Sequence, residues 1–116
     1  FFINKNYADK NNLELSNIQV FGWQENFRET ISQILSSQKN NEIDLIKISF
    51  SPNGFLTLEE KDLKTILLGF NQNLIRYQLQ IITNLKDQLK RKNILEKIDN
   101  IDLTNPNNPK IKVFKS

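Results

Sequence analysis

Three carboxylates stand close together near the middle of the chain, at Glu59, Glu60 and Asp62. Clustered carboxylates can bind a divalent cation or share the work of general acid and general base. Charged residues between two alternating apolar segments are also typical of a hairpin turn that lies in water. We expect this second arrangement, in which the three side chains are solvated and do no chemistry. The same expectation holds for Asp99 and Asp102, although Asp102 could also make a structural hydrogen bond.

Basic residues are the other charged groups that could act on a ligand. Lys86 and Lys90–Lys92 lie in the second half of a long amphipathic segment, where they could contact phosphates or lipid headgroups. Cations near the end of a helix also interact favourably with the helix dipole, without any ligand. We expect this simpler role for all of them.

The segment near the C-terminal end alternates basic and apolar side chains, which is typical of a strand. One face carries Ile111 and Val113, and the other carries two lysines and Phe114. From the residues alone, lysines on an edge strand are best explained as protection against aggregation. The alternative is a docking strand, with Phe114 as an aromatic anchor and the lysines facing an acidic partner. The candidate partner-binding residues are Lys110, Ile111, Lys112, Val113 and Phe114.

The composition excludes several kinds of active site. The 116 residues include no Cys, no His and no Met, and the formal net charge is +3. Absence of Cys removes disulfides and thiolates, and absence of His removes the commonest general base and zinc ligand. The chain also lacks a phosphate-binding loop and a serine nucleophile motif. We therefore expect a protein that is not an enzyme, needs no cofactor and no metal, and tolerates an acidic partner without demanding nucleic acid.

The length is that of one domain, covering residues 1–116. The chain begins with Phe1 rather than Met, so we expect a processed product or a fragment of a longer protein. It contains no apolar run long enough to span a bilayer, and no signal peptide. Any membrane anchor is therefore expected upstream of Phe1.

Two segments have apolar residues at helical spacing. The first predicted helix covers Gln24–Gln38, places Trp23 in the core and ends in the polar stretch Ser36–Asn41. The second begins near Asn71 or Asn73, either of which can cap it, and ends at the basic cluster described above.

Three segments between these helices have the pattern of strands. The first alternates over Ile46–Phe50, with its apolar residues facing the core. Ser51–Gly54 has the composition of a tight turn, since Pro presets the first corner and Gly accepts a positive φ. Phe55–Gly69 contains two further strands, of which Leu63–Gly69 is the more continuously apolar. We expect these strands to form an antiparallel meander.

After the second helix, Ile98–Leu103 alternates again, Thr104–Pro109 is a loop rich in Pro and Asn, and Lys110–Phe114 is the last strand. The order of elements is therefore α-β-β-β-α-β-β. We expect an α+β fold, with a mostly antiparallel sheet and two helices packed on one face. Two segments near the start, Phe1–Tyr7 and Leu13–Phe21, are candidates for additional strands.

Short motifs in this series carry a resemblance to a known family. The strand Leu56-Thr57-Leu58 leads through a polar turn to a strand that ends in Leu68-Gly69, and an amphipathic helix precedes Ile101-Asp102-Leu103. In these pieces and their order, over about Gln24–Lys115, the chain resembles the C-terminal domain of the bacterial cell-division family FtsQ (DivIB in Gram-positive bacteria). One departure is Thr104, which stands where the family commonly has Arg. Partner contacts near that loop are therefore expected to differ.

The resemblance implies a non-enzymatic scaffold of the divisome. Such proteins are bitopic, with one transmembrane helix, a small POTRA domain and then this domain on the extracytoplasmic side of the plasma membrane. They bind FtsB and FtsL at the division septum and help to recruit the septal peptidoglycan machinery. The resemblance also implies that a partner adds to the last strand, Lys110–Phe114, and an edge strand is physically suited to this.

Two other kinds of protein remain open. An extracytoplasmic assembly-platform domain of a pilus or secretion system would have a ferredoxin-like β-α-β-β-α-β order, with a helix that starts near Glu59. A strand over Leu63–Leu68 would instead favour the FtsQ-like fold. A small RNA-binding α+β module would need aromatic and basic residues interleaved on an exposed sheet face. Only Phe114, with Lys110 and Lys112, offers that pattern.

Overall fold

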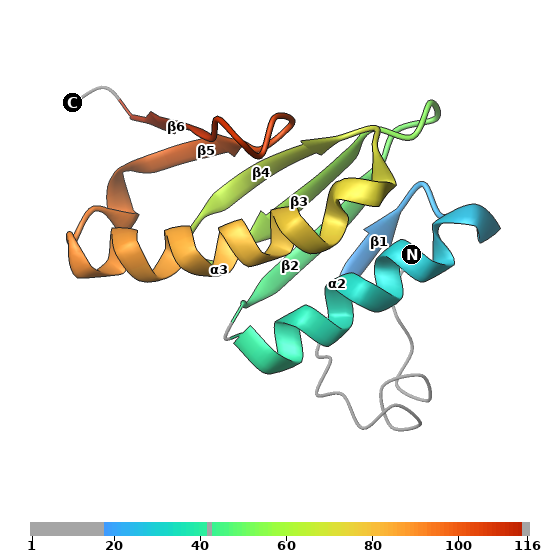
Figure 1. Ribbon diagram of the computed structural model, residues 1–116, viewed down its shortest axis with the longest axis horizontal. Coiled ribbons are helices and arrows are strands. Elements are labelled where there is room, and N and C mark those ends of the chain that lie inside the picture. The colour runs from blue at the N-terminus through green and yellow to red at the C-terminus, as the bar shows by residue number, and fades with distance from the viewer. Residues whose placement is uncertain (1–17, 42, 115–116) are drawn as a thin grey trace.

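The computed structural model describes residues 18–41 and 43–114, in which two helices cover one face of a sheet (Figure 1). Of the candidate N-terminal strands, Phe1–Tyr7 lies outside the described residues, and the described part of Leu13–Phe21 contains β1 (Gln19–Phe21). The other strands are β2 (Leu45–Phe50), β3 (Leu56–Glu60), β4 (Lys64–Gly69), β5 (Ile98–Asp102) and β6 (Lys110–Val113). The helices are α2 (Arg28–Asn41) and α3 (Ile75–Arg91).

The described strands lie in the sheet in the order of the chain, from β1 at one edge to β6 at the other. β2, β3 and β4 form the predicted antiparallel meander, and β6 is antiparallel to β5. β1 and β2 are parallel, as are β4 and β5, because a helix joins each pair and returns the chain to the same end of the sheet. The α+β class is thus confirmed, with both helices on one face, and the sheet that we expected to be mostly antiparallel is mixed.

The first helix is longer than predicted. A 3-10 turn over Glu25–Phe27 leads into α2, which continues to Asn41 through the polar stretch that we expected to end it. Neither Gly nor Pro occurs in that stretch, so its helix propensity is low but sufficient. On the inner side of the helix the predicted apolar residues are buried, namely Phe27, Ile31, Ile34 and Leu35.

Trp23 does not lie in the core, contrary to the sequence prediction. Its side chain is 37% exposed, because it precedes the helix in an extended segment where helical spacing does not apply. The chain turns at Gly22, which has a φ of 74° and lies so close to the carbonyl oxygen of Phe50 that a Cβ would be 1.9 Å from it. The core aromatic pair is instead Phe27 stacked on Phe50, with ring centroids 3.9 Å apart.

β2 contains a bulge that changes one prediction. The register with β3 shifts between Leu45 and Lys47, so Ile46 is an extra residue on this strand. Ile46 is 50% exposed, and Leu45 takes its expected place in the core. Ile48 and Phe50 are buried, as predicted.

α3 packs its apolar side over the sheet. The side chain of Asn71 accepts a hydrogen bond from the N–H of Asn73 at 3.0 Å and so caps the 3-10 turn Gln72–Leu74 that leads into α3. The α-helix itself begins later than predicted, at Ile75, and the residue before it, Leu74, makes no side-chain cap. Gln78 is polar but only 1% exposed, in the middle of the apolar side. Its Nε2 donates to the carbonyls of Leu68 at 2.7 Å and Leu103 at 3.0 Å. This amide therefore ties α3 to the ends of β4 and β5.

Candidate functional site

β6 lies at the edge of the sheet and is exposed along its whole length (Figure 1). Among the described residues it pairs with β5 alone. Its two apolar residues, Ile111 and Val113, are 38% and 49% exposed, and Phe114 after it is 57% exposed. All five predicted partner-binding residues therefore lie together on one accessible strip of the molecule.

The register of β6 on β5 separates its apolar and basic side chains, as predicted. Ile111 lies opposite Ile101, which is fully buried under the helices. Ile111 and Val113 therefore belong to the helix side of the sheet, because residues two apart share a face. The two lysines of the strand belong to the opposite side, which no described helix covers (Figure 1).

The backbone groups of β6 also divide between its two sides. Backbone groups of successive residues in a strand point toward opposite neighbours. Phe114 donates its N–H to the carbonyl of Lys97, toward β5, at 2.9 Å. Lys112 and Lys110 lie two and four residues before Phe114, so their backbone groups also point toward β5. Those of Ile111 and Val113 point away, so these two residues supply the N–H and C=O groups of the free edge.

Hydrogen bonds hold the loop that precedes β6. Thr104 donates its N–H and its hydroxyl to Oδ1 of Asp102, at 2.9 Å and 2.6 Å. Tyr77 of α3 donates its hydroxyl to Oδ1 of Asn107 in the loop, at 3.2 Å, and Pro106 is buried. These contacts fix the position from which β6 starts, and Asp102 makes the structural hydrogen bond considered from the sequence.

The same contacts act on the charge of Asp102. Hydrogen bonds from the hydroxyl and the N–H of Thr104 lower the pKa of Asp102, while burial opposes this weakly and the charge of Lys110 supports it. The methyl group of Thr104 also faces Gly69, where a Cβ would lie 3.3 Å from it. Thr104, the residue that departs from the FtsQ pattern, thus has a role within this fold.

The carboxylate of Glu60 contradicts the expectation that the acidic cluster is solvated. The side chain of Glu60 is 0% exposed. It accepts hydrogen bonds from three backbone N–H groups and one ammonium, those of Asp62 at 2.7 Å, Leu63 at 3.0 Å, Asp44 at 2.9 Å and Lys86 at 2.5 Å. Both oxygens are thereby occupied with internal donors, so this carboxylate is suited to stability and not to a metal or a substrate.

The other two carboxylates of the cluster remain partly exposed. Glu59 pairs with Lys47 at 3.5 Å, and Asp62 lies 3.5 Å from Lys86. Glu60 differs because it continues the two-residue alternation of the buried leucines in β3 onto the helix side of the sheet. That phase was present in the sequence and could have identified the buried carboxylate.

Lys86 is the second charged residue whose role the sequence prediction missed. It lies within α3 rather than at its end, and its side chain is 13% exposed. Burial lowers the pKa of Lys86, but the hydrogen bond and charge of Glu60, with the charges of Asp62 and Asp44, raise it by more. The pair links α3 to the β3–β4 turn. Lys90 and its neighbour in the last turn are placed as the helix-dipole expectation requires.

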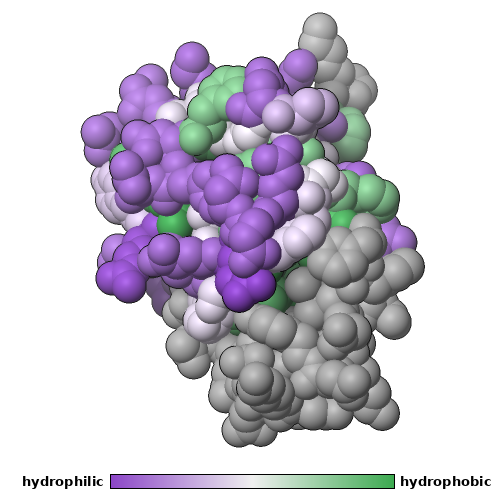
Figure 2. Space-filling model, turned by 90° about the vertical axis from the view of Figure 1, so that its right-hand side faces the viewer, coloured by the Kyte–Doolittle hydropathy of each residue, from purple (hydrophilic) through white to green (hydrophobic). Residues whose placement is uncertain are grey.

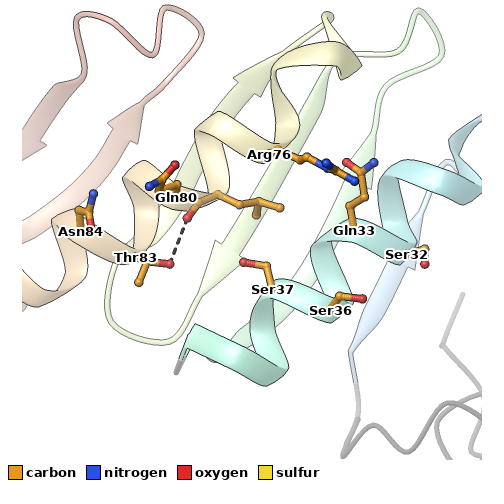
Figure 3. A pocket seen from close by; sticks show the side chains of 9 residues that line it. Ser32, Gln33, Ser36, Ser37, Arg76, Gln80, Thr83 and Asn84 are labelled. Carbon is orange, nitrogen blue, oxygen red and sulfur yellow. Dashed lines mark hydrogen bonds between the residues drawn. The ribbon is translucent and has the colours of Figure 1, made fainter.

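A polar groove of about 510 Å³ lies between α2 and α3 (Figure 3). The Thr83 hydroxyl on its wall donates to the carbonyl of Leu79 at 3.1 Å, and no described residue donates a hydrogen bond to the buried Oε1 of Gln33. Such a lining can hold water or a small polar molecule. Other lining residues include Ser32, Ser36 and Ser37 of α2 and Arg76, Gln80 and Asn84 of α3.

Exposed aromatic residues also lie at the end of the sheet that carries the β2–β3 turn. Phe21 is 46% exposed and Phe70 is 59% exposed, and Phe70 contacts Phe55 edge to face at 5.0 Å between centroids. Figure 2 views this end and shows the apolar areas of the described surface as small and separated by polar residues. The described surface that is visible in this view therefore shows no continuous apolar face for a partner.

No group of three or more His, Cys, Asp or Glu side chains among the described residues is placed to hold a metal ion. No helix within residues 18–41 and 43–114 combines the length and the apolar character needed to cross a membrane. Comparison of the sequence with known protein families and with curated proteins gives no match.

Proposed function

We propose that this domain is a non-enzymatic divisome scaffold of the FtsQ/DivIB kind, which binds partner proteins by strand addition at β6. In this proposal its partners are FtsB- and FtsL-type proteins, on the extracytoplasmic side of the plasma membrane at the division septum. A transmembrane helix and a POTRA domain precede it in the full-length protein. Through its partners it helps to recruit the septal peptidoglycan machinery.

The observation that carries the proposal is the open edge of β6. The strand is exposed, and the backbone groups of Ile111 and Val113 point away from β5. An edge strand with unpaired N–H and C=O groups can accept an extended segment of another chain. Phe114 adds an exposed aromatic side chain beside this edge, and aromatic residues often supply a large share of the binding energy.

The meander also supports this function over an assembly-platform domain. That alternative needs a helix starting near Glu59, and this part of the chain instead forms β3 and β4. A strand over Lys64–Gly69 agrees with the order of elements on which the resemblance to FtsQ rests.

The test compares two phenylalanines of nearly equal exposure. Phe114 is 57% exposed beside β6, and Phe70 is 59% exposed after β4. Binding of a soluble FtsB- or FtsL-type partner is measured by isothermal titration calorimetry. Phe114→Ala should weaken binding by about 1–3 kcal/mol, because it removes an aromatic anchor. Phe70→Ala should leave the affinity unchanged. If a folded Phe114→Ala variant binds as well as the parent chain, the anchor assignment is wrong.

A further inference from the structure

The free edge of β6 determines how an added strand would lie. Its outward backbone groups belong to Ile111 and Val113, whose side chains lie on the helix side of the sheet. A strand that pairs with this edge, in either direction, places every second side chain on the helix side and the others on the open side. The two faces of β6 therefore impose different requirements on alternate residues of the partner.

The helix side of β6 continues into an apolar flank of α3. Tyr77 is 45% exposed and reaches Asn107 in the β5–β6 loop, so this flank of the helix faces β6. Ile81 and Leu85 follow Tyr77 at intervals of four residues and therefore lie along the same side of α3. Both are only partly buried against the core. Apolar side chains of an added strand would bury this flank together with the exposed apolar residues of β6.

The open side of β6 is basic. Lys110 and Lys112 lie opposite Asp102 and Asn100 on β5, so only one of the two lysines has a carboxylate across the strand pair. Neither lysine forms an ion pair within 4.0 Å among the described residues. Carboxylates on an added strand would face these ammonium groups at cross-strand distance, where opposite charges attract.

We infer that the segment bound at β6 is an extended strand in which apolar and acidic side chains alternate, the apolar ones packing on the Ile111 and Val113 side and the acidic ones facing Lys110 and Lys112. This inference rests on the proposed function, because it takes strand addition at β6 as given. It adds the chemistry of the partner, which is an acidic amphipathic peptide.

The experiment uses the full chain and synthetic peptides of about eight residues, which is the length of a strand. One peptide alternates leucine with glutamate, and its control alternates leucine with lysine. We expect the glutamate peptide to bind at least about tenfold more tightly, as measured by fluorescence anisotropy, and its affinity to fall with salt. The double variant Lys110→Glu with Lys112→Glu should reverse this preference.

A proline variant tests the backbone part of the inference. Val113→Pro removes an N–H from the free edge, whereas the N–H groups that pair with β5 belong to its neighbours, so the fold should survive. The glutamate peptide should then lose at least about tenfold in affinity. Thermal unfolding of the variant checks that the domain remains folded. Val113→Ala is the matched control, because it keeps the N–H and removes only part of the apolar side chain, so it should lose less affinity for the glutamate peptide than Val113→Pro does.

The outcomes separate this inference from the proposed function. Equal binding of the two peptides, both sensitive to Val113→Pro, would overturn the acidic partner and leave strand addition intact. Failure of both peptides, while an FtsB- or FtsL-type partner still binds and Phe114→Ala weakens it, would overturn the inference alone. If that partner also fails to bind, the proposed function fails too, and the lysines serve only to prevent aggregation. If the partner binds but Phe114→Ala has no effect on its affinity, the anchor assignment of Phe114 is wrong.

Discussion

The junction of Glu60 with Lys86 and the edge strand β6 are both rich in charge, yet they differ completely in exposure. At the junction an ion pair is buried, and the carboxylate has four hydrogen-bond donors. On β6 two lysines are exposed and form no ion pair with another described residue. Charge in a sequence therefore does not determine exposure; a charged side chain is buried where donors converge on it.

The largest expected effect concerns the buried carboxylate. Glu60→Ala leaves the Lys86 ammonium and three backbone N–H groups without their acceptor, so the free energy of unfolding should fall by about 3–5 kcal/mol. Glu59→Ala is the matched control, since Glu59 is 39% exposed and pairs with Lys47 at 3.5 Å. Its cost should be about 1 kcal/mol or less. Urea denaturation followed by circular dichroism measures both, and equal losses would contradict the distinction between junction and surface.

This contrast also shows how far the sequence predicts the molecule. Alternation and turn composition identify the meander, including the Ser51–Gly54 turn, in which the Gly54 N–H donates to the Ser51 carbonyl at 2.9 Å. They also identify β6 and the division of its two faces. Periodicity cannot show that Asp44 and Lys86, which are 16 and 26 residues from Glu60, converge on it.

Periodicity likewise does not predict the direction of strands or the position of bulges. The parallel pairs of the sheet depend on where each helix returns the chain, which a local pattern does not record. One inserted residue at a bulge reverses the phase of those before it, as at Ile46. The prediction for Trp23 is wrong because it applies helical spacing to a residue that precedes the helix, where the backbone is extended.

A second pair of variants compares buried and exposed hydrogen bonds of α3. Gln78→Leu keeps most of the side-chain volume but leaves the carbonyls of Leu68 and Leu103 without their donor, so we expect a loss of about 1–3 kcal/mol. Tyr77→Phe removes only the exposed hydrogen bond to Asn107 and should change stability by about 0.5 kcal/mol or less. Urea denaturation again decides. If Tyr77→Phe lowers the free energy of unfolding as much as Gln78→Leu does, the hydrogen bond between Tyr77 and Asn107 is as well shielded from water as those of Gln78.

A smaller effect is expected from the pH dependence of the junction. The folded-state pKa of Lys86 is raised. The charged Lys86 therefore makes its full contribution to the free energy of unfolding below its ordinary pKa of about 10.4. That contribution is lost as the pH rises through the folded-state pKa. Denaturation of the parent chain and of Lys86→Met from about pH 8 to about pH 11 should give stability curves that converge at high pH. Curves that stay parallel would contradict the raised pKa.

The smallest effect belongs to the carboxylate beside the open edge. The folded-state pKa of Asp102 is lowered, so its contribution is complete above its ordinary pKa of about 3.9 and is lost as the pH falls through the folded-state pKa. Asp102 is only half-buried, and water weakens its interactions, so this acid dependence should be weaker than the alkaline dependence at Lys86.

Nuclear magnetic resonance titration of the Asp102 carboxyl carbon measures the pKa directly. Thr104→Val removes the hydroxyl donor but keeps the N–H, and should move the pKa of Asp102 part of the way back toward its ordinary value. If the pKa does not move, the hydroxyl does not stabilise the charge of Asp102. The hydrogen bond from the Thr104 N–H and the charge of Lys110 then remain as the causes of the lowered pKa.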